Sequence, residues 1–240
     1  ITVDVSEVDG AVSLGGATVS GGTSGAIVVN ADGTQGRVTT QFLIAESVTI
    51  NAAGSSEGVF SFVSADQVSL TGSMISNNTF NVSATRGGTI SGGALNDFIE
   101  LFSVPEANTK ALFTLTGGLG SDLFEIRYAG GQTVIEITDF NPAEDVLNLF
   151  RPTAVYSQDE FGSNAGSIIS EAIGMEIFNS QLASRTVGSD VYYATANDSY
   201  VVLKGITTQP LDPFFRNGDM VIKLIGVNNL GNLEGTILTG

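Results

Sequence analysis

A weak repeat of 20 residues in the first half of the chain constrains the fold more than any other feature. Short β-branched and aromatic segments at constant spacing indicate a β-solenoid, in which each coil stacks its apolar columns on the next and buries them. The alternative is a β-sandwich whose strands happen to recur. The columns are Val28, Val48 and Val68; Phe42, Phe62 and Val82; Phe60 and Phe80; and Ile50, Leu70 and Ile90, separated by the corners NADG (30–33), NAAGSSEG (51–58) and GSMISNN (72–78).

The segments before the repeat carry a weaker pattern. TVDVSEV (2–8) alternates between polar and apolar residues and reads as a strand. LGGATVSGGTSGA (14–26) is rich in Gly, Ser and Thr, and forms either a loose first coil or a linker.

The pattern changes after about residue 150. A helix is expected within 163–178, and two strands joined by a turn at Asn197-Asp198 are expected within 190–206. GDMVIKLIGV (218–227) resembles those strands. A solenoid end exposes unpaired strand edges, so a strand-rich cap is expected here. Together these patterns predict an all-β protein, a parallel β-solenoid or β-roll with a C-terminal cap and at most one or two short helices.

The segment GGLGSDLF (117–124) indicates a cation-binding turn. Gly117, Gly118 and Gly120 permit a tight turn with positive φ, which aims several backbone carbonyls inward. Asp122 adds a carboxylate, and oxygen donors without nitrogen or sulfur suit a hard cation such as calcium. A phosphate-binding loop would need a helix after the glycines, whereas LFEIRY reads as a strand.

A degenerate copy of this turn lies in SGGALNDFIEL (91–101). Gly92, Gly93 and Asp97 match the full motif, while Leu95 replaces its third glycine. Two nine-residue repeats complete a β-roll coil of about 18 residues, so turns on one side recur at about that spacing. The two turns start about 25 residues apart, and an insertion at 103–109 would absorb the difference. We therefore expect Asp97 and Asp122 to stack on one side and to share or neighbour calcium sites.

The run DFNPAEDVLNL (139–149) follows the second turn and adds two acidic candidates, Asp139 and Asp145. Each is a candidate calcium ligand. Aspartates in such positions equally often cap a turn by accepting hydrogen bonds from backbone amides, so both roles stay open.

These segments resemble the RTX family of secreted bacterial calcium-binding proteins, whose repeat is GGxGxDxUx with U a large apolar residue. GGLGSDLFE fits that repeat fully, GGALNDFIE fits it in part, and VIEITDFNPAEDVLNL (134–149) is similar to the segment that commonly follows the last repeat. The resemblance covers roughly 91–230 and is strongest in 117–150. This chain has one full and one partial repeat where the family usually has many, so only a short roll is expected.

The resemblance implies a ligand set for calcium. Asp97 and Asp122 would supply carboxylates. The backbone carbonyls that would complete the shell are those of Gly92, Gly93 and Leu95 in one turn and of Gly117, Gly118, Leu119 and Gly120 in the other.

The resemblance also implies export by a one-step bacterial secretion machine and folding on meeting extracellular calcium. We therefore expect a secreted or cell-surface protein. Because the chain starts at Ile1, a leader has been removed or the chain is part of a longer polypeptide. The family includes proteases, lipases, toxins, adhesins and surface-layer proteins, so the motif identifies a folding module and not an activity.

Composition excludes several classes of function. The chain has 25 acidic and 9 basic residues and a net charge of −16, which argues against nucleic acid and anionic membranes as partners. No apolar run approaches the roughly 18 residues of a membrane-spanning helix. The chain has no cysteine and no histidine, which excludes disulfides, thiolate catalysis and a Ser-His-Asp triad.

The acidic pairs of the sequence do not suggest an enzyme. Glu144-Asp145 and Asp159-Glu160 are adjacent, whereas glycosidases need two carboxylates on opposite sides of a cleft. A polysaccharide lyase needs several cations in its groove, and the first 110 residues contain only Arg37, Arg86 and Lys110. We therefore expect no catalytic activity.

The first hypothesis on function is a secreted, calcium-dependent structural protein that assembles with itself into a surface layer, matrix or filament. One alternative is the calcium-folding and secretion module of a larger enzyme or toxin. Another is a calcium-dependent adhesin or carbohydrate-binding module, with a cell-surface polysaccharide as partner. The expected organisation is a solenoid repeat region at 1–90, a short calcium-binding roll at 91–150 and a β-rich cap at 151–240.

Overall fold

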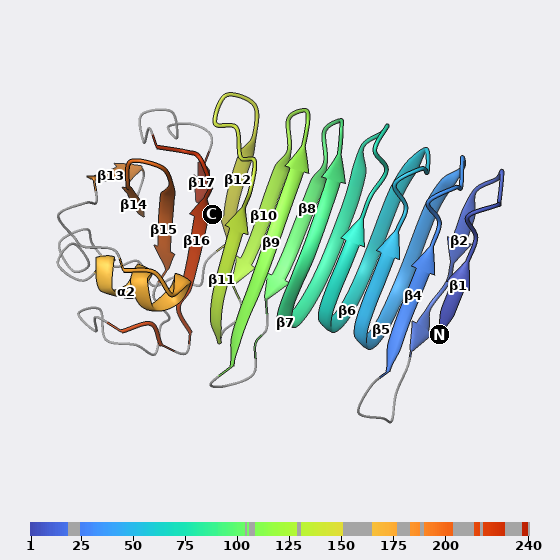
Figure 1. The fold of residues 1–240 in the computed structure, drawn as a ribbon, viewed down its shortest axis with the longest axis horizontal. Helices are drawn as coiled ribbons and strands as arrows, with labels where there is room; N and C mark the ends of the chain where they lie inside the picture. Colours follow the sequence, from blue (N-terminus) through green and yellow to red (C-terminus); the bar gives the residue numbers. More distant parts are fainter. Residues whose placement is uncertain are drawn as a thin grey trace.

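Stacked parallel coils form a β-solenoid of about six turns (Figure 1). The structure is a computed structural model. It describes residues 1–18, 25–103, 105, 109–128, 131–150, 165–176, 183–187, 190–203, 214–216, 218–228 and 237–239. The solenoid strands are β1 (Thr2–Asp4), β2 (Val12–Leu14), β3 (Ala17–Thr18), β4 (Ala26–Asn30), β5 (Arg37–Asn51), β6 (Glu57–Thr71), β7 (Asn78–Gly93), β8 (Phe98–Ser103), β9 (Lys110–Gly118), β10 (Leu123–Tyr128), β11 (Gln132–Ile137) and β12 (Val146–Phe150).

Each coil contributes to two sheets. β5, β6 and β7 are long enough to bend and supply both sheets by themselves, and they pair in parallel along most of their length. Later coils use two separate strands: β8 and β10 continue one sheet, while β9 and β11 continue the other. Each coil therefore rests on its neighbours through two rows of backbone hydrogen bonds.

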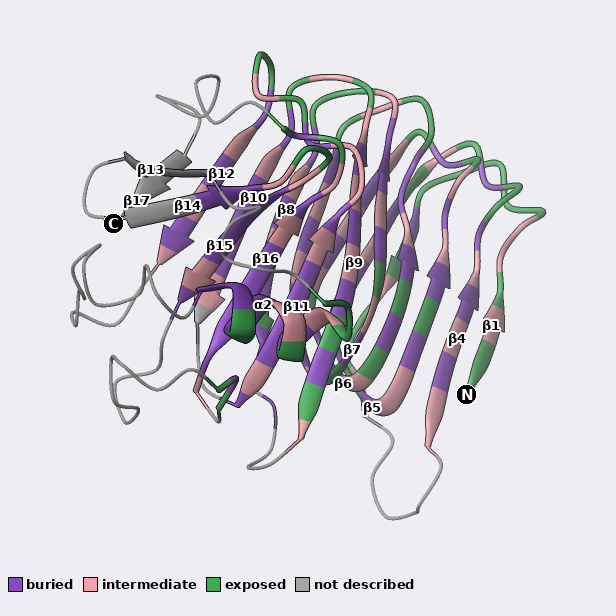
Figure 2. Ribbon diagram, turned by 60° about the vertical axis from the view of Figure 1, so that its left-hand side comes forward, coloured by how far each residue is buried: buried purple, intermediate pink, exposed green. Residues whose placement is uncertain are grey.

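The core lies between the two sheets and consists of inward-facing columns. One column runs Phe60, Phe80, Ile99, Phe124 and Leu147, all of which are buried. Figure 2 shows buried and partly exposed residues alternating along the strands, as expected where only one face of each sheet is covered. A second column, on the other sheet, runs Ile50, Leu70, Ile90, Leu115 and Ile137.

The structure confirms the predicted solenoid and most of the 20-residue columns. Ile50, Leu70 and Ile90 stack, as do Phe60 and Phe80, whose ring centroids are 5.0 Å apart. Val48 stacks on Val68.

The position predicted for Val28 is wrong. Val28 pairs with Thr49 and faces outward, and Ile27 takes the core place beside Val48. The corner between β4 and β5 is one residue longer than the repeat requires, so the 20-residue spacing selects the residue after the buried one.

The column of Phe42, Phe62 and Val82 is also wrong. Phe42 and Phe62 do stack, with parallel rings 4.8 Å apart, but they point outward and are 54% and 55% exposed. Val82 pairs instead with Val63, because the register shifts between β6 and β7. Both phenylalanines have left-handed backbone, with φ of 53° and 55°. That conformation costs roughly 1–2 kcal/mol for an L-residue with a side chain.

The last coils end in the predicted strand-rich cap. β16 and β17 continue the parallel ladders beyond β11 and β12, whereas β13, β14 and β15 run antiparallel. The turn at Asn197-Asp198 joins β14 to β15 as expected. The cap elements are α2 (Ala165–Ile173), β13 (Ala183–Val187), β14 (Asp190–Ala194), β15 (Ser199–Leu203), β16 (Met220–Leu224) and β17 (Ile237–Thr239).

Helix α2 covers the end of one sheet. It is the one helix among the described residues, and it is shorter than the segment 163–178 in which it was expected. Its apolar side chains Ile168 and Ile169 lie in a buried cluster with Val134, Tyr193 and Tyr200. No helix in the described part of the chain is long and apolar enough to cross a membrane.

The division into three regions at residues 90 and 150 stays a prediction. β7 runs through the first boundary and pairs with β6 on one side and with β8 and β9 on the other. At the opposite end of the solenoid, β1 pairs with β4 only among the described strands.

The two neighbouring phenylalanines of β6 should respond differently to truncation. Phe60→Ala removes a fully buried ring and should lower the free energy of unfolding by about 3–5 kcal/mol. Phe62→Ala removes an exposed ring and should change it by less than about 1 kcal/mol. Urea unfolding of both variants measures the difference, and equal losses would contradict the outward placement of Phe62.

Candidate metal centre

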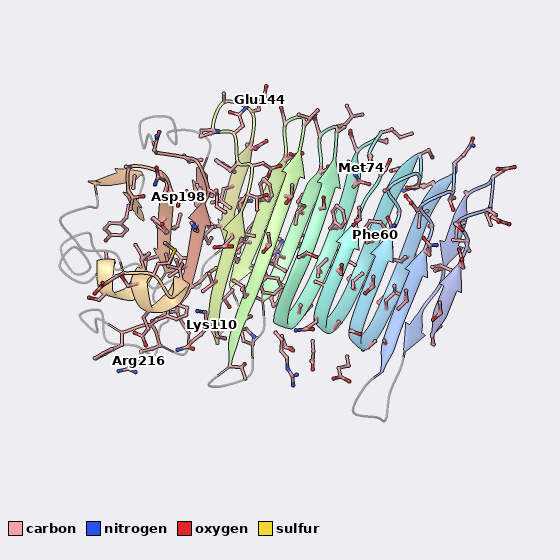
Figure 3. All side chains as sticks on the ribbon, in the orientation of Figure 1. Phe60, Met74, Lys110, Glu144, Asp198 and Arg216 are labelled. Carbon is pink, nitrogen blue, oxygen red and sulfur yellow. The ribbon has the colours of Figure 1, made fainter. Side chains whose placement is uncertain are left out.

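The turns predicted to bind calcium gather along one edge of the solenoid. Figure 3 labels Met74 and Glu144 on this edge, at the ends of the coils. The turns are the segments between β6 and β7, β7 and β8, β9 and β10, and β11 and β12. The predicted stacking of Asp97 and Asp122 on one side of the solenoid is present, because these turns follow one another from coil to coil.

Four buried side chains connect these turns, and we call them the Asx ladder: Asn78, Asp97, Asp122 and Asp145. Asp145 Oδ1 accepts a hydrogen bond from the backbone N–H of Asp122 at 2.8 Å, and Asp122 Oδ1 accepts one from Asp97 N–H at 2.7 Å. Asp97 Oδ1 accepts hydrogen bonds from the backbone and side-chain nitrogens of Asn78, at 2.6 and 2.9 Å. Each side chain thus satisfies a backbone donor of the preceding coil.

Sequence reasoning missed Asn78, the neutral member of the ladder. Its Oδ1 accepts hydrogen bonds from the N–H groups of Gly58 and Ser73, at 3.1 and 2.6 Å, and its Nδ2 donates to Ser73 O. The available signal was a glycine, Gly72, six residues earlier, which nearly repeats the glycine-to-aspartate spacing of the two recognised turns.

The first glycine of each turn is required for space. A methyl group on Gly72, Gly92 or Gly117 would collide with the ladder side chain of its own turn. The positive φ expected of the glycines occurs at Gly118 and Gly120, at 108° and 117°, whereas Gly117 does not adopt it.

Asp139 and Asp145 both accept hydrogen bonds from backbone amides. Asp139 accepts one from Gly117 N–H at 3.0 Å and one from Gly118 N–H at 2.7 Å. The second oxygen of Asp145 accepts one from Asn141 N–H at 2.7 Å. These contacts correspond to the capping role, and calcium binding by the two residues stays a prediction.

One ladder oxygen has no hydrogen-bond partner. Asp97 Oδ2 is buried, and a methyl group on Gly92 would collide both with this oxygen and with the carbonyl oxygen of Gly117. The two oxygens therefore border the same small space. A carboxylate oxygen beside a carbonyl oxygen needs a proton or a cation to offset their repulsion. Buried carboxylate and carbonyl oxygens also match the donor set that calcium prefers, so the residues present fit the ion.

The protonation of the ladder acids is displaced in the same direction. Burial raises the pKa of Asp97 to about 6, against the hydrogen bonds from Asn78, which lower it. Burial also raises the pKa of Asp122 to about 7, and the neighbouring charges of Asp145, Asp97 and Asp139 add to the rise. The pKa of Asp145 is raised too, mainly by burial. Ionising these groups together is costly unless a cation is bound.

The remaining predicted carbonyl donors lie on the outer part of the same turns. The two turns stack there, because Leu119 N–H donates to the Gly93 carbonyl at 3.0 Å and Gly120 lies against the backbone of Leu95. Among the residues that the structure describes, no three acidic side chains converge on one point. A calcium site in these turns would therefore combine few carboxylates with several backbone carbonyls.

Comparison with protein-family models, with curated proteins and with solved structures found no match for this chain. The fold and the chemistry of the turns therefore carry the functional argument.

The raised pKa of Asp122 predicts that, without calcium, the protein is more stable in mild acid than at neutral pH. Its folded pKa of about 7 exceeds the ordinary 3.8, so between these values the folded protein binds more protons than the unfolded chain. The free energy of unfolding should fall as pH rises through this window. Thermal melts with a chelator should give a higher Tm at about pH 5 than at about pH 7.5.

Asp122→Asn keeps an acceptor for Asp97 N–H and should reduce this pH dependence. Asp32→Asn, in an exposed corner between β4 and β5, should leave it unchanged. A Tm that rises with pH over this range in the wild-type protein would contradict the assignment.

Proposed function

We propose that this protein is a secreted, calcium-dependent structural subunit that assembles with itself at the bacterial cell surface or in an extracellular matrix. The observation that carries the proposal is the unpartnered, buried Asp97 Oδ2 beside the Gly117 carbonyl, within turns that match a calcium-binding repeat.

Calcium would join adjacent coils in this position. Asp97 and Asp122 would supply negative charge, and the carbonyls of the two glycine turns would supply neutral oxygen ligands. The ion would provide charge neutralisation between coils that otherwise hold stacked, buried carboxyls. Its binding free energy would then add directly to the stability of the folded solenoid.

A structural role is favoured over catalysis by the way the chain uses its acidic groups. In the solenoid, the ladder acids accept hydrogen bonds from backbone amides, and Glu57, Asp66, Glu100 and Glu125 pair with arginines. The net charge of −16 keeps copies of the chain apart, and a divalent cation offsets that repulsion efficiently. Self-assembly is therefore proposed to depend on calcium.

One observation favours the alternative, a calcium-folding and secretion module of a larger enzyme or toxin. β1 hydrogen-bonds only to β4 among the described strands, so its other edge could receive a further coil. In that case calcium would stabilise folding without promoting assembly.

Calcium should raise the Tm of the wild-type protein but not that of Asp97→Asn. Extracellular sites bind calcium at about 10⁻⁴–10⁻³ M, so millimolar calcium should add roughly 1–3 kcal/mol per site. In chelator, Asp97→Asn should melt no lower than wild type, because Asn78 shows that an amide serves in this ladder. Asp32→Asn is the matched control and should retain the calcium-dependent rise. Identical wild-type melts with calcium and chelator would remove the calcium claim.

Calcium should also cause assembly at an ionic strength where monovalent salt does not. Light scattering and electron microscopy of the full chain should show ordered particles in millimolar calcium that dissociate on addition of chelator. Sodium chloride at matched ionic strength should leave the protein dispersed, because screening alone does not bridge carboxylates. A calcium-bound protein that stays monomeric at high concentration would favour the secretion module.

A further inference from the structure

Phe42 and Phe62 are not explained by the fold or by the calcium turns. Both have strained left-handed backbone, and both hold a ring in solvent. Their stack is open at each end in the described part of the chain. Gly16 lies against Phe42 without a side chain to cover it, and β7 makes the equivalent passage with one residue fewer than β6. The solenoid can therefore be built without these phenylalanines.

The two rings belong to a wider apolar surface, which we call the phenylalanine face. It is the outward side of the sheet formed by residues 37–44, 57–64, 78–84, 98–103, 123–128 and 146–150. Ile44 and Phe102 lie on it and are 46% and 41% exposed. Between them, half-buried apolar side chains face the same way: Val59, Phe98, Leu123 and Val146.

This face is nearly neutral in a strongly acidic chain. Its segments contain two arginines and three glutamates, which gives a net charge of −1, against −16 for the whole protein. All five are paired within the face: Arg37 with Glu57 at 3.1 Å, and Arg127 with Glu100 and Glu125 at 2.5 Å each. Two copies can approach each other here without bringing unpaired acidic groups together.

We infer that the phenylalanine face is the contact between two copies of this chain. The strand spacing of about 4.8 Å and rise of about 3.3 Å give the six segments an area of roughly 600 Å² per copy. Two such faces bury roughly the 1,000 Å² or more that a specific interface needs. The inference rests on the self-assembly part of the proposed function and names its surface.

The relief of the face suits a two-fold arrangement. Phe42 and Phe62 project from β5 and β6, while the neighbouring outward residues Ser64, Asn81 and Ser83 are short. A two-fold axis near Ser64 would place the projecting rings of each copy over the short side chains of the other. Exposed aromatic rings seated in such positions are the usual anchors of protein interfaces.

Sedimentation of the full chain over a concentration series, in millimolar calcium, tests the inference. The wild-type protein should form dimers or larger species, and the double variant Phe42→Ser/Phe62→Ser should dissociate at least roughly tenfold more readily. The matched control is Met74→Ser/Ile75→Ser, which removes two exposed apolar side chains from a turn outside the face. It should associate as wild type does. Equal association of the two double variants would overturn the inference.

Cysteine cross-linking gives a second measurement that does not depend on truncating an aromatic residue. The chain has no cysteine, so a single introduced thiol reports one contact. Ser64→Cys should form a covalent dimer under mild oxidation, because a residue near a two-fold axis meets its own copy. Ser69→Cys lies on the same strand but on the other sheet and should stay reduced. Comparable cross-linking at both positions, or at neither, would overturn the proposed contact.

Failure of this inference is distinguishable from failure of the proposed function. If Phe42→Ser/Phe62→Ser still assembles with calcium, the interface is wrong while calcium-dependent assembly stands. If the wild-type protein dimerises through Ser64→Cys equally well in chelator, the interface stands and calcium dependence fails. A wild-type protein that is monomeric in both conditions overturns both.

Discussion

Hydrogen bonds from buried Asx side chains to the backbone of the neighbouring coil close this solenoid at its turns. In the sheets, every coil is paired by strand hydrogen bonds, but the chain must leave the ladder at each turn and expose amide groups there. Asn78, Asp97, Asp122 and Asp145 return a partner to one such amide in each preceding coil. The glycines of the turns follow from this arrangement, because a side chain at Gly92 or Gly117 would occupy the space that the Asx side chain fills.

Much of the solenoid could be predicted from the sequence, since stacking places equivalent residues at a constant spacing. Ile50, Leu70 and Ile90 recur at 20 residues because β5, β6 and β7 have equal lengths between those positions. A periodic pattern cannot show which face a residue points to when a coil gains or loses one residue. Ile27 replaces Val28 for that reason, and a local backbone bulge turns Phe42 and Phe62 outward.

The turns could be predicted from their glycine and aspartate spacing, but the role of each residue could not. The motif identified Asp97 and Asp122 and their stacking, which the ladder hydrogen bond between them bears out. It did not show that their first oxygens serve backbone amides, because that requires the position of the next coil. Asn78 escaped notice for a related reason: it performs the same structural task as the aspartates without a charge, and a search for metal ligands looks only for charge.

The order of residues in the Asx ladder divides the solenoid along its axis. Each coil touches only its neighbours, so the free energy of opening is distributed from coil to coil. The ladder is neutral at Asn78, near the start of β7, and carries an ionisable group in every turn from Asp97 to Asp145. Protons or cations in the surroundings therefore change the opening free energy of the coils from β7 to β12 and leave the coils before them unaffected. The molecule has one half of fixed cohesion and one half whose cohesion follows the composition of the medium.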